Sequence, residues 1–306
     1  MVKKLEEELI LDNMINIEHT EDEIIFGDNI ILFDEPSHTY TTPEGHKFTS
    51  VTTVIGKYET PFNRDYWLKV KAKERGITVE MLAEEWDKTN QEACERGNLI
   101  HNLLEDNIRE GYKKLKNPTQ GTFSLDKNNA ISSVNQLHRK PNFKIIYNLY
   151  PEIFNYLISL LERGYILYAE NRICLIDFLI AGTIDLLAVK ADYSDFIIVD
   201  WKTNKKPLYF KSGYISKRTG KWVDKVQFFK EPLNFIPECK GMLYSLQLST
   251  YAYMVEQYGL NCKGLALFHM LPDPITNKET VKSYRIPYHR KAVHNMLVHH
   301  KNTYAA

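Results

Sequence analysis

The sequence predicts a protein of the α/β class with α+β character, in which a short mixed sheet is flanked by helices. The first observation is a succession of apolar runs of strand length, at about 165–175, 178–190, 195–202, 263–270 and 281–286. The second is that segments with helical features precede, separate and follow these runs. With 43% hydrophobic and 25% charged residues, the 306-residue chain has a globular composition and is long enough to bury a large core.

The N-terminal part, residues 1–60, is predicted to be an acidic segment followed by two β-hairpins that pack on the core. Residues 24–34 predict a hairpin with its turn at Gly27-Asp28-Asn29. Residues 38–58 predict a second hairpin that turns at Pro43-Glu44-Gly45. The main domain is assigned to residues 61–306.

Four segments of the main domain are predicted to be helical. They cover residues 63–111, with breaks near Gly76 and Thr89-Asn90, then 151–163, 240–258 and a C-terminal stretch from His289. Pro151 suits a first helical turn, and Gly259 is a typical stop signal. Residues 112–142 are polar and rich in turn formers, so we expect a variable insertion there.

Two acids and a lysine come at the ends of neighbouring strands. Asp185 lies inside one apolar run, and the next run, Ile197 to Val199, ends in Asp200-Trp201-Lys202. Side chains alternate along a strand, so Asp200 and Lys202 point to one side and Trp201 points to the other. We therefore expect two carboxylates and one ammonium to converge at one place on the sheet.

This combination suits the hydrolysis of a phosphodiester bond. Mg²⁺ or Mn²⁺ prefers oxygen ligands, which Asp185 and Asp200 supply. Lys202 can hydrogen-bond a water molecule and offset the negative charge of the transition state. The alternative is that Asp185 begins a turn and that Asp200 and Lys202 form a surface pair.

Three further segments extend the pattern: ERGNLIHNLLED (95–106), YAENRICL (168–175) and YSLQLSTYAYMVEQYG (244–259). With GTID and DWKT (182–185 and 200–203), they resemble the PD-(D/E)xK nuclease superfamily and its RecB-like exonuclease branch. The resemblance is closest to the mitochondrial genome maintenance exonuclease group and its phage relatives. It implies a restriction-endonuclease-like core. The chain departs from the name of the superfamily because Ile184, not proline, precedes Asp185.

The resemblance also implies roles for single residues. His101 would contact the metal or a phosphate, and the Trp201 backbone carbonyl would be a further metal ligand. Gln247 would reach the metal site or the DNA backbone. Alternatives stay open: His101 is a core histidine bonded to a backbone carbonyl, and Tyr251, one helical turn from Gln247, belongs to the core.

Two more acids have two interpretations each. Glu105 lies one turn after His101 on the same helical face, where it either reaches the metal through water or pairs with a lysine. Glu170, on the strand before that of Asp185, is either a third acid of the site or a charge at the edge of the strand.

The net charge is zero, but its distribution is uneven. Residues 1–36 hold eleven acids and two lysines, whereas 202–230 hold nine basic residues and one acid, with six Tyr, Trp and Phe residues. Basic groups neutralise phosphates and aromatic rings stack on unpaired bases. We expect a basic flap near 203–235 that contacts DNA; the alternative is a solvated loop. Candidate DNA-binding residues are Lys205, Lys217, Arg218 and Lys221.

The cysteines are Cys94, Cys174, Cys239 and Cys262, and their spacing forms no Cys-x-x-Cys. We therefore expect reduced thiols and no iron–sulfur cluster. The sequence has no apolar run of 18 residues and no evident targeting signal. These features predict a protein that does not span a membrane, in a bacterial or phage-infected host cytosol.

The predicted function is that of a Mg²⁺- or Mn²⁺-dependent DNA exonuclease. Its substrate would be single-stranded or end-containing DNA in recombination, replication or repair, where other proteins of these processes are candidate partners. Two alternatives remain: a non-catalytic nucleic-acid-binding module with the nuclease fold, and a structure- or sequence-specific endonuclease. The complete set of His101, Asp185, Asp200 and Lys202 disfavours the first alternative, and the Gly97–His101 and Gln247–Tyr251 spacings disfavour the second.

Overall fold

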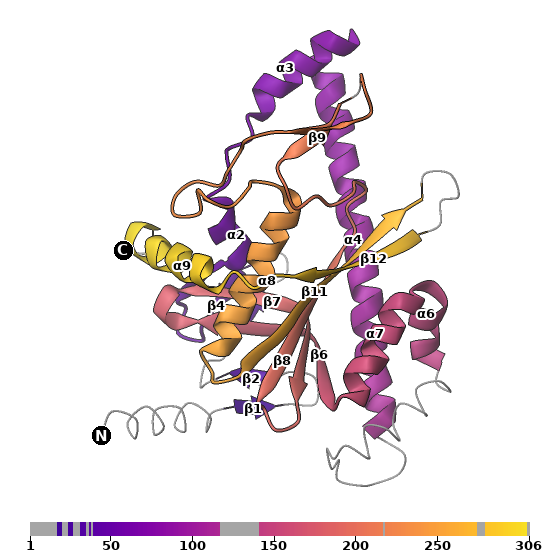
Figure 1. The fold of residues 1–306 in the computed structure, drawn as a ribbon, viewed down its shortest axis with the longest axis vertical. Coiled ribbons are helices and arrows are strands. Elements are labelled where there is room, and N and C mark those ends of the chain that lie inside the picture. The colour runs from indigo at the N-terminus through magenta and orange to yellow at the C-terminus, as the bar shows by residue number, and fades with distance from the viewer. Residues whose placement is uncertain are drawn as a thin grey trace.

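A central sheet with helices on both sides organises the chain (Figure 1). The computed structural model describes residues 17–19, 24–26, 31–34, 37, 39–116, 141–216, 218–273 and 279–304. The predicted mixed α/β class is confirmed. No helix in these ranges is long and apolar enough to cross a membrane.

The central sheet has eight strands in the order β12-β11-β8-β7-β5-β4-β3, with β6 also paired to β7. The pairs β5–β7 and β8–β11 are parallel, and the remaining pairs are antiparallel. The three strands predicted between residues 165 and 202 are confirmed at the centre. The strands are β3 (Leu32–Asp34), β4 (Thr39–Thr41), β5 (Lys47–Ser50), β6 (Tyr165–Leu175), β7 (Ile180–Lys190), β8 (Asp195–Lys202), β11 (Asn261–Pro272) and β12 (Glu279–Ile286).

Helices cover both faces of this sheet. Successive side chains of β8 point to opposite faces, so Trp201 and Lys202 contact different helices. The Trp201 ring lies 5.7 Å from that of Phe268, which in turn lies 5.1 Å from Tyr156 on α7. On the other face, Lys202 lies over the ring of Tyr244 on α8. The helices are α2 (Val51–Gly56), α3 (Arg64–Arg75), α4 (Val79–Lys116), α6 (Pro141–Leu149), α7 (Pro151–Glu162), α8 (Lys240–Glu256) and α9 (Arg290–Tyr304).

The first predicted hairpin is wrong. β2 (Ile24–Phe26) pairs with β1 (Ile17–His19), whereas β3 pairs with β4, so the runs on either side of Gly27-Asp28-Asn29 belong to different sheets. Phe26 is buried, and its ring lies 5.0 Å from that of Tyr258. β2 therefore packs on the core through Phe26. The turn itself and the acidic residues 1–16 lie outside the described residues.

The second predicted hairpin is confirmed as β4 and β5, with Gly45 at φ 87° in the turn. The extended conformation ends at Ser50, however, and α2 begins there. The Ser50 side chain accepts a hydrogen bond from the Thr53 backbone N–H, which caps the helix. The local capping signal thus outweighs the strand-like Val-Thr-Thr-Val sequence.

The predicted helical region 63–111 is α3 and α4. The break at Gly76 is confirmed, and this residue closes α3 at φ 65°. The break at Thr89-Asn90 is wrong, because α4 continues through it and the Thr89 hydroxyl donates to the Glu85 carbonyl, 2.8 Å away. The predicted insertion at 112–142 begins later, since α4 extends to Lys116; residues 117–140 lie outside the described residues.

The basic segment after β8 contains a short antiparallel hairpin of β9 (Gly213–Ile215) and β10 (Trp222–Asp224). Gly213 allows the two strands of this hairpin to lie close together at Trp222, because a Cβ on Gly213 would lie 2.3 Å from the Trp222 ring. In Figure 1 this segment lies toward the same end of the long axis as α3. The predicted excursion from the sheet is confirmed, and its contact with DNA stays a prediction.

Candidate active site

One edge of β7 is shared by two strands, with a short opening between them. β6 pairs along the whole of β7 on the opposite edge. On the shared edge, β5 pairs with Ile180 and Ala181, and β8 pairs from Leu186 to Val189. Among the described residues, 182–185 therefore have no strand partner on this edge, and groups from helices can reach the backbone there.

Three acids lie in register at this opening, on three neighbouring strands. Glu170 falls between paired residues of β6 and is placed opposite Asp185. The β7–β8 ladder ends at the pair Leu186 and Val199, so Asp185 and Asp200 are the next residues on their strands. The strand register thus gathers three carboxyl groups that are far apart in sequence.

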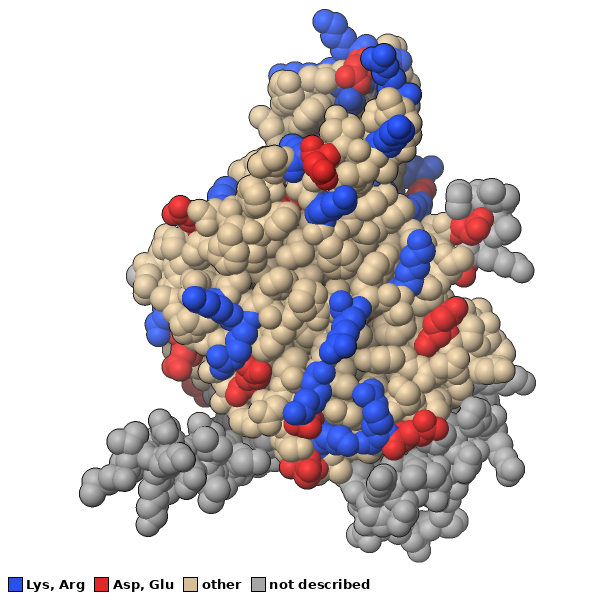
Figure 2. Space-filling model, viewed as in Figure 1, with Lys and Arg blue, Asp and Glu red and all other residues tan. Residues whose placement is uncertain are grey.

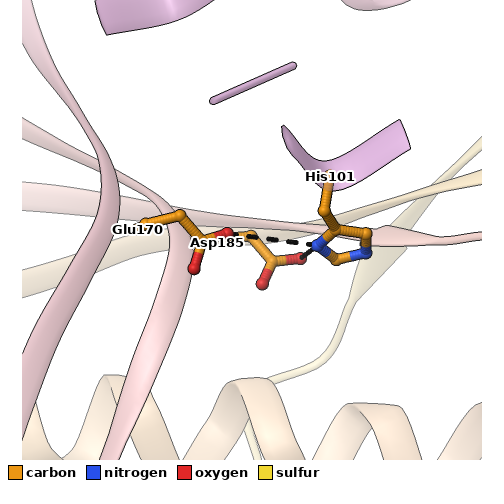
Figure 3. A group of neighbouring side chains, drawn as sticks. All are labelled: His101, Glu170 and Asp185. Atoms are coloured by element: carbon orange, nitrogen blue, oxygen red, sulfur yellow. Dashed lines mark ion pairs between the residues drawn. The ribbon is translucent and has the colours of Figure 1, made fainter. Parts of the chain in front are cut away.

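Glu170 interrupts its strand. Its φ of 51° lies in the left-handed region, which is uncommon for a residue other than glycine. The ladder with β7 is broken at this residue and resumes at Asn171. Backbone strain of this kind is often found at functional sites. Here the residue with the left-handed backbone is Glu170, and its carboxylate lies beside Asp185 and His101 (Figure 3).

His101 approaches the acids from α4. Its Nε2 lies 3.1 Å from the Trp201 carbonyl oxygen and donates a hydrogen bond to it. In the neutral ring this bond leaves the lone pair on Nδ1. Nδ1 lies 3.6 Å from an Asp185 oxygen and 4.0 Å from a Glu170 oxygen. His101 therefore lies beside Asp185, as predicted, and is also bonded to a backbone carbonyl.

His101, Glu170 and Asp185 form a group that can hold a metal ion. Their ligand atoms all lie within 4.8 Å of one another, and each side chain is partly exposed. Two carboxylate oxygens and one imidazole nitrogen suit Mn²⁺, and they also suit Mg²⁺ when water completes its shell. The residues present therefore fit the predicted cation.

Burial and neighbouring negative charges raise the pKa of Glu170. Burial, followed by the charges of Asp185 and Glu105, raises the pKa of the Glu170 carboxyl to about 9, although Arg109 opposes the shift. A bound divalent cation would supply the missing positive charge and keep Glu170 ionised. Glu170 thus lies in the site rather than at a solvated strand edge.

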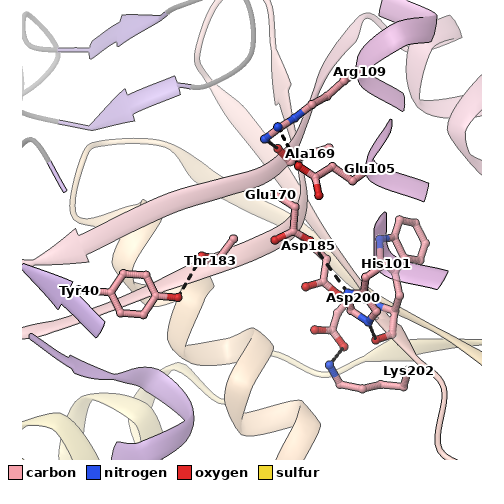
Figure 4. A network of polar contacts seen from close by, with 11 residues as sticks. Tyr40, His101, Glu105, Arg109, Ala169, Glu170, Thr183, Asp185, Asp200 and Lys202 are labelled. Atoms are coloured by element: carbon pink, nitrogen blue, oxygen red, sulfur yellow. Dashed lines mark hydrogen bonds and ion pairs between the residues drawn. The ribbon is translucent and has the colours of Figure 1, made fainter. Parts of the chain in front are cut away.

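Asp200 and Lys202 form a buried ion pair next to this group (Figure 4). The Lys202 Nζ lies 2.5 Å from an Asp200 oxygen, and the Asp200 residue is 3% exposed. Burial raises the pKa of Asp200 to about 6, although Lys202 opposes the shift. Burial would lower the pKa of Lys202, but the charges of Asp200 and Asp185 outweigh it and raise this pKa. Asp200 binds lysine through one of its two oxygens, and its role as a metal ligand stays a prediction.

The Trp201 backbone is held from both sides. Its N–H donates to an Asp185 oxygen, 2.9 Å away, and its carbonyl accepts from His101. The side chain, 1% exposed, packs on the opposite face of the sheet. The predicted role of this carbonyl as a metal ligand stays a prediction, because His101 occupies it here.

Glu105 pairs with Arg109 one turn along α4, at 2.7 Å, and Arg109 also donates to the Ala169 carbonyl. Glu105 therefore binds a basic residue, but the partner is an arginine where the alternative expected a lysine. The pair ties α4 to the residue before Glu170 and sets the distance between the helix and β6.

Gln247 and Tyr251 lie on α8, which covers the opening of β7. Tyr251 is 5% exposed, and its hydroxyl is hydrogen-bonded to Gln247. Gly182 allows this packing, because a Cβ there would lie 2.7 Å from the Tyr251 ring. Tyr251 therefore belongs to the core and Gln247, half-buried, borders the site.

The predicted DNA-binding residues do not join the acid group. Lys205, Arg218 and Lys221 are exposed on the segment that follows β8. Lys217 lies outside the described residues. On the face drawn in Figure 2, basic side chains are spread from the end where α3 lies to the lower half of the molecule and form no single patch.

Two residues of the site were not predicted from sequence. Tyr244 places its ring 4.9 Å from the Lys202 Nζ, and Arg96 binds the backbone just after Lys202. Tyr244 is three residues before Gln247 on the same helical face, and Arg96 directly precedes Gly97. These short distances in sequence from Gln247 and Gly97 could have indicated that Tyr244 and Arg96 lie near the site.

Comparisons with known proteins add little to this geometry. No family model and no curated protein matches the chain. One solved structure, titled "Crystal structure of SSO0001", matches 67% of this chain and 86% of its own, with 14% sequence identity and a TM-score of 0.24. A similarity at this level carries no argument, so the site is interpreted from its own residues.

Proposed function

We propose that this protein is a metal-dependent nuclease that hydrolyses DNA phosphodiester bonds, with a PD-(D/E)xK core of the RecB-like branch. The observation that carries the proposal is the group of Glu170, Asp185 and Asp200 in register, with His101 and Lys202 beside it. The carboxylates and the imidazole provide a site for a cation. The buried lysine next to it provides an ammonium group that can donate hydrogen bonds to a phosphate.

A divalent cation bound at this site would polarise the phosphate and promote the ionisation of water. The protein groups have separate tasks. His101, Glu170 and Asp185 would hold the cation. Lys202 donates hydrogen bonds to a phosphate oxygen or to the attacking water once its contact with Asp200 loosens, and it offsets charge in the transition state. Gln247 borders the site from α8, where an amide can bind the DNA backbone.

Exonuclease action on single-stranded or end-containing DNA is the specific form that we propose. The resemblance to RecB-like exonucleases supports it, because the chain carries both the Gly97–His101 and the Gln247–Tyr251 segments and His101 lies beside Asp185. The basic hairpin segment supports a nucleic-acid substrate. Partner proteins from recombination or replication would then act on the same DNA.

The test uses end-labelled single-stranded, duplex and circular DNA with Mg²⁺, Mn²⁺ or a chelator. We expect metal-dependent shortening of linear DNA and no cleavage of circles. Asp200→Asn keeps the side-chain volume but removes both the predicted charged metal ligand and the anionic partner of Lys202, so we expect cleavage to be abolished. Wild-type cleavage by this variant at saturating Mg²⁺ would contradict the assignment.

Two other outcomes identify the alternative functions. Cleavage of circular DNA would indicate an endonuclease. DNA binding without cleavage under every metal condition would indicate a non-catalytic binding module.

A further inference from the structure

Within the described part of the chain, the end of β8 has no strand partner on the side of β7, and side chains bind its backbone instead. The β7–β8 ladder ends at Val199, so the following residues cannot use β7 for their backbone hydrogen bonds. The Trp201 N–H instead donates to Asp185. The carbonyls of Trp201 and Thr203 accept from His101 and Arg96, both on α4.

Arg96 and His101 therefore bind alternate carbonyls of one strand end. Carbonyls two residues apart point to the same side of a strand, which is why one helix reaches both. Lys202, the residue between them, points its side chain into the site. The position of Lys202 thus depends on two hydrogen bonds that α4 supplies.

Arg96 makes three contacts beyond its own helix. It donates to the Thr203 carbonyl, to the Met270 carbonyl at 3.2 Å, and to a Glu279 oxygen at 2.6 Å. The other Glu279 oxygen accepts from the Tyr150 hydroxyl at 2.7 Å. A single guanidinium, 20% exposed, therefore joins α4 to β8, β11 and β12.

A second side chain holds the next residue. His269 on β11 is completely buried and donates from Nε2 to the Asn204 carbonyl at 2.7 Å. His269 is also the register partner of Lys202 in the parallel β8–β11 pair. The backbone before and after Lys202 is consequently held by side chains, of which His269 is completely buried.

We propose that Arg96 is a positioning residue that holds the β8 end against α4, so that His101 and Lys202 keep their places at the cation site. This inference rests on the proposed function for its catalytic consequence, but the positioning itself is a property of the protein without DNA or metal. Lysine cannot replace Arg96, because one ammonium lacks the planar set of donors that reaches three separated acceptors.

The test compares Arg96→Lys and Arg96→Gln with Arg75→Gln. Arg75 binds Glu85 through two hydrogen bonds of 2.9 Å on the exposed α3–α4 surface, so its loss is a matched control for a broken arginine–carboxylate pair. Backbone hydrogen exchange is measured on peptides that cover residues 201–206, without metal. Mn²⁺ binding is measured by electron paramagnetic resonance, and kcat and KM are measured on linear DNA.

For both Arg96 variants we expect exchange at 201–206 to accelerate by about tenfold or more, because a charge-assisted hydrogen bond is removed. Mn²⁺ affinity should fall about 10- to 100-fold, as is typical when a residue that orients ligands is removed. On DNA, kcat should fall more than KM changes. The Arg75 variant should match the wild type in all three measurements.

Wild-type exchange at 201–206 and wild-type Mn²⁺ affinity in a folded Arg96→Lys protein would overturn the inference. If Arg96→Gln does not fold, the lysine variant decides. If the wild-type protein cleaves no DNA, the proposed function fails, whereas hydrogen exchange still decides the positioning role. Faster exchange with unchanged Mn²⁺ affinity would also overturn it, since Arg96 would then stabilise the strand without affecting the site.

Discussion

Asp185 binds the backbone N–H of Trp201 with one of its carboxylate oxygens, at 2.9 Å, and that same oxygen lies 3.6 Å from His101 Nδ1. One carboxylate therefore fixes the end of β8 and faces the candidate cation site. His101 completes the arrangement by donating to the Trp201 carbonyl. The backbone of Trp201, between Asp200 and Lys202, is thus a structural part of the candidate site.

The Tyr244 ring is predicted to hold the Lys202 ammonium in place. The ring centroid lies 4.9 Å from Nζ, and such a contact contributes about 0.5–2 kcal/mol. Tyr244→Phe keeps the ring and should retain a near-wild-type kcat, whereas Tyr244→Leu should lower kcat about 2- to 30-fold. Equal kcat values for the Phe and Leu variants, from single-turnover cleavage, would rule out this role.

Glu170 is predicted to make the metal-free protein less stable as pH rises. Its pKa of about 9 exceeds that of an unfolded glutamate, so the folded state binds the proton more tightly. This contribution to stability is fully present below about pH 4.3, the ordinary glutamate pKa, and is lost as pH rises toward about 9. Urea unfolding in a chelator should show this decline.

Glu170→Gln is the matched variant for this effect, because it keeps the shape and cannot ionise. At pH 8 without metal it should be more stable than the wild type by at least about 1.4 kcal/mol, the free energy of one pKa unit. Saturating Mn²⁺ should stabilise the wild type more than the variant. A wild type that is as stable as the variant at pH 8, and that gains no more from Mn²⁺, would remove Glu170 from the site.

Much of the fold follows from local patterns, and the failures come from long-range packing. The alternating strands at 165–202 and the helix stop at Gly76 are visible in sequence. The strand that pairs with β2 cannot be read from the sequence, because the three residues of β2 pack through Phe26 on Tyr258, which is distant in sequence. Thr89-Asn90 is only a weak break signal, which the surrounding helix α4 overrides.

The candidate site shows the same division. Alternation along β8 predicts that Asp200 and Lys202 share a face, as they do. The alignment of Glu170 with Asp185 depends on the register of two strands, and a left-handed residue interrupts that register. Neither feature can be read from local sequence, so the place of Glu170 follows only from the paired strands.

Gly182→Ala is predicted to destabilise the protein through Tyr251. The added Cβ would lie 2.7 Å from one ring carbon and 2.8 Å from the hydroxyl oxygen, so the buried ring must move. Overpacking of this kind costs about 1–3 kcal/mol. Gly264→Ala on β11 is the control, since a Cβ there meets nothing within 4 Å. Urea unfolding checks the difference, and equal stabilities of the two variants would show that Tyr251 adapts freely.

The basic hairpin segment is predicted to bind phosphates. Arg218 and Lys221 are exposed next to the turn between β9 and β10, and Lys217 adjoins them in sequence. Changing all three to Ala should weaken DNA binding and lower the slope of log affinity against log salt by roughly one unit for each phosphate that the variant no longer neutralises. Mn²⁺ affinity should stay unchanged, because these residues do not belong to the acid group. Lys291→Ala, at an exposed position of α9, is the control and should leave the slope unaltered. An unchanged affinity and salt slope in the triple variant would mean that the segment is an ordinary solvated loop and that the DNA path lies elsewhere.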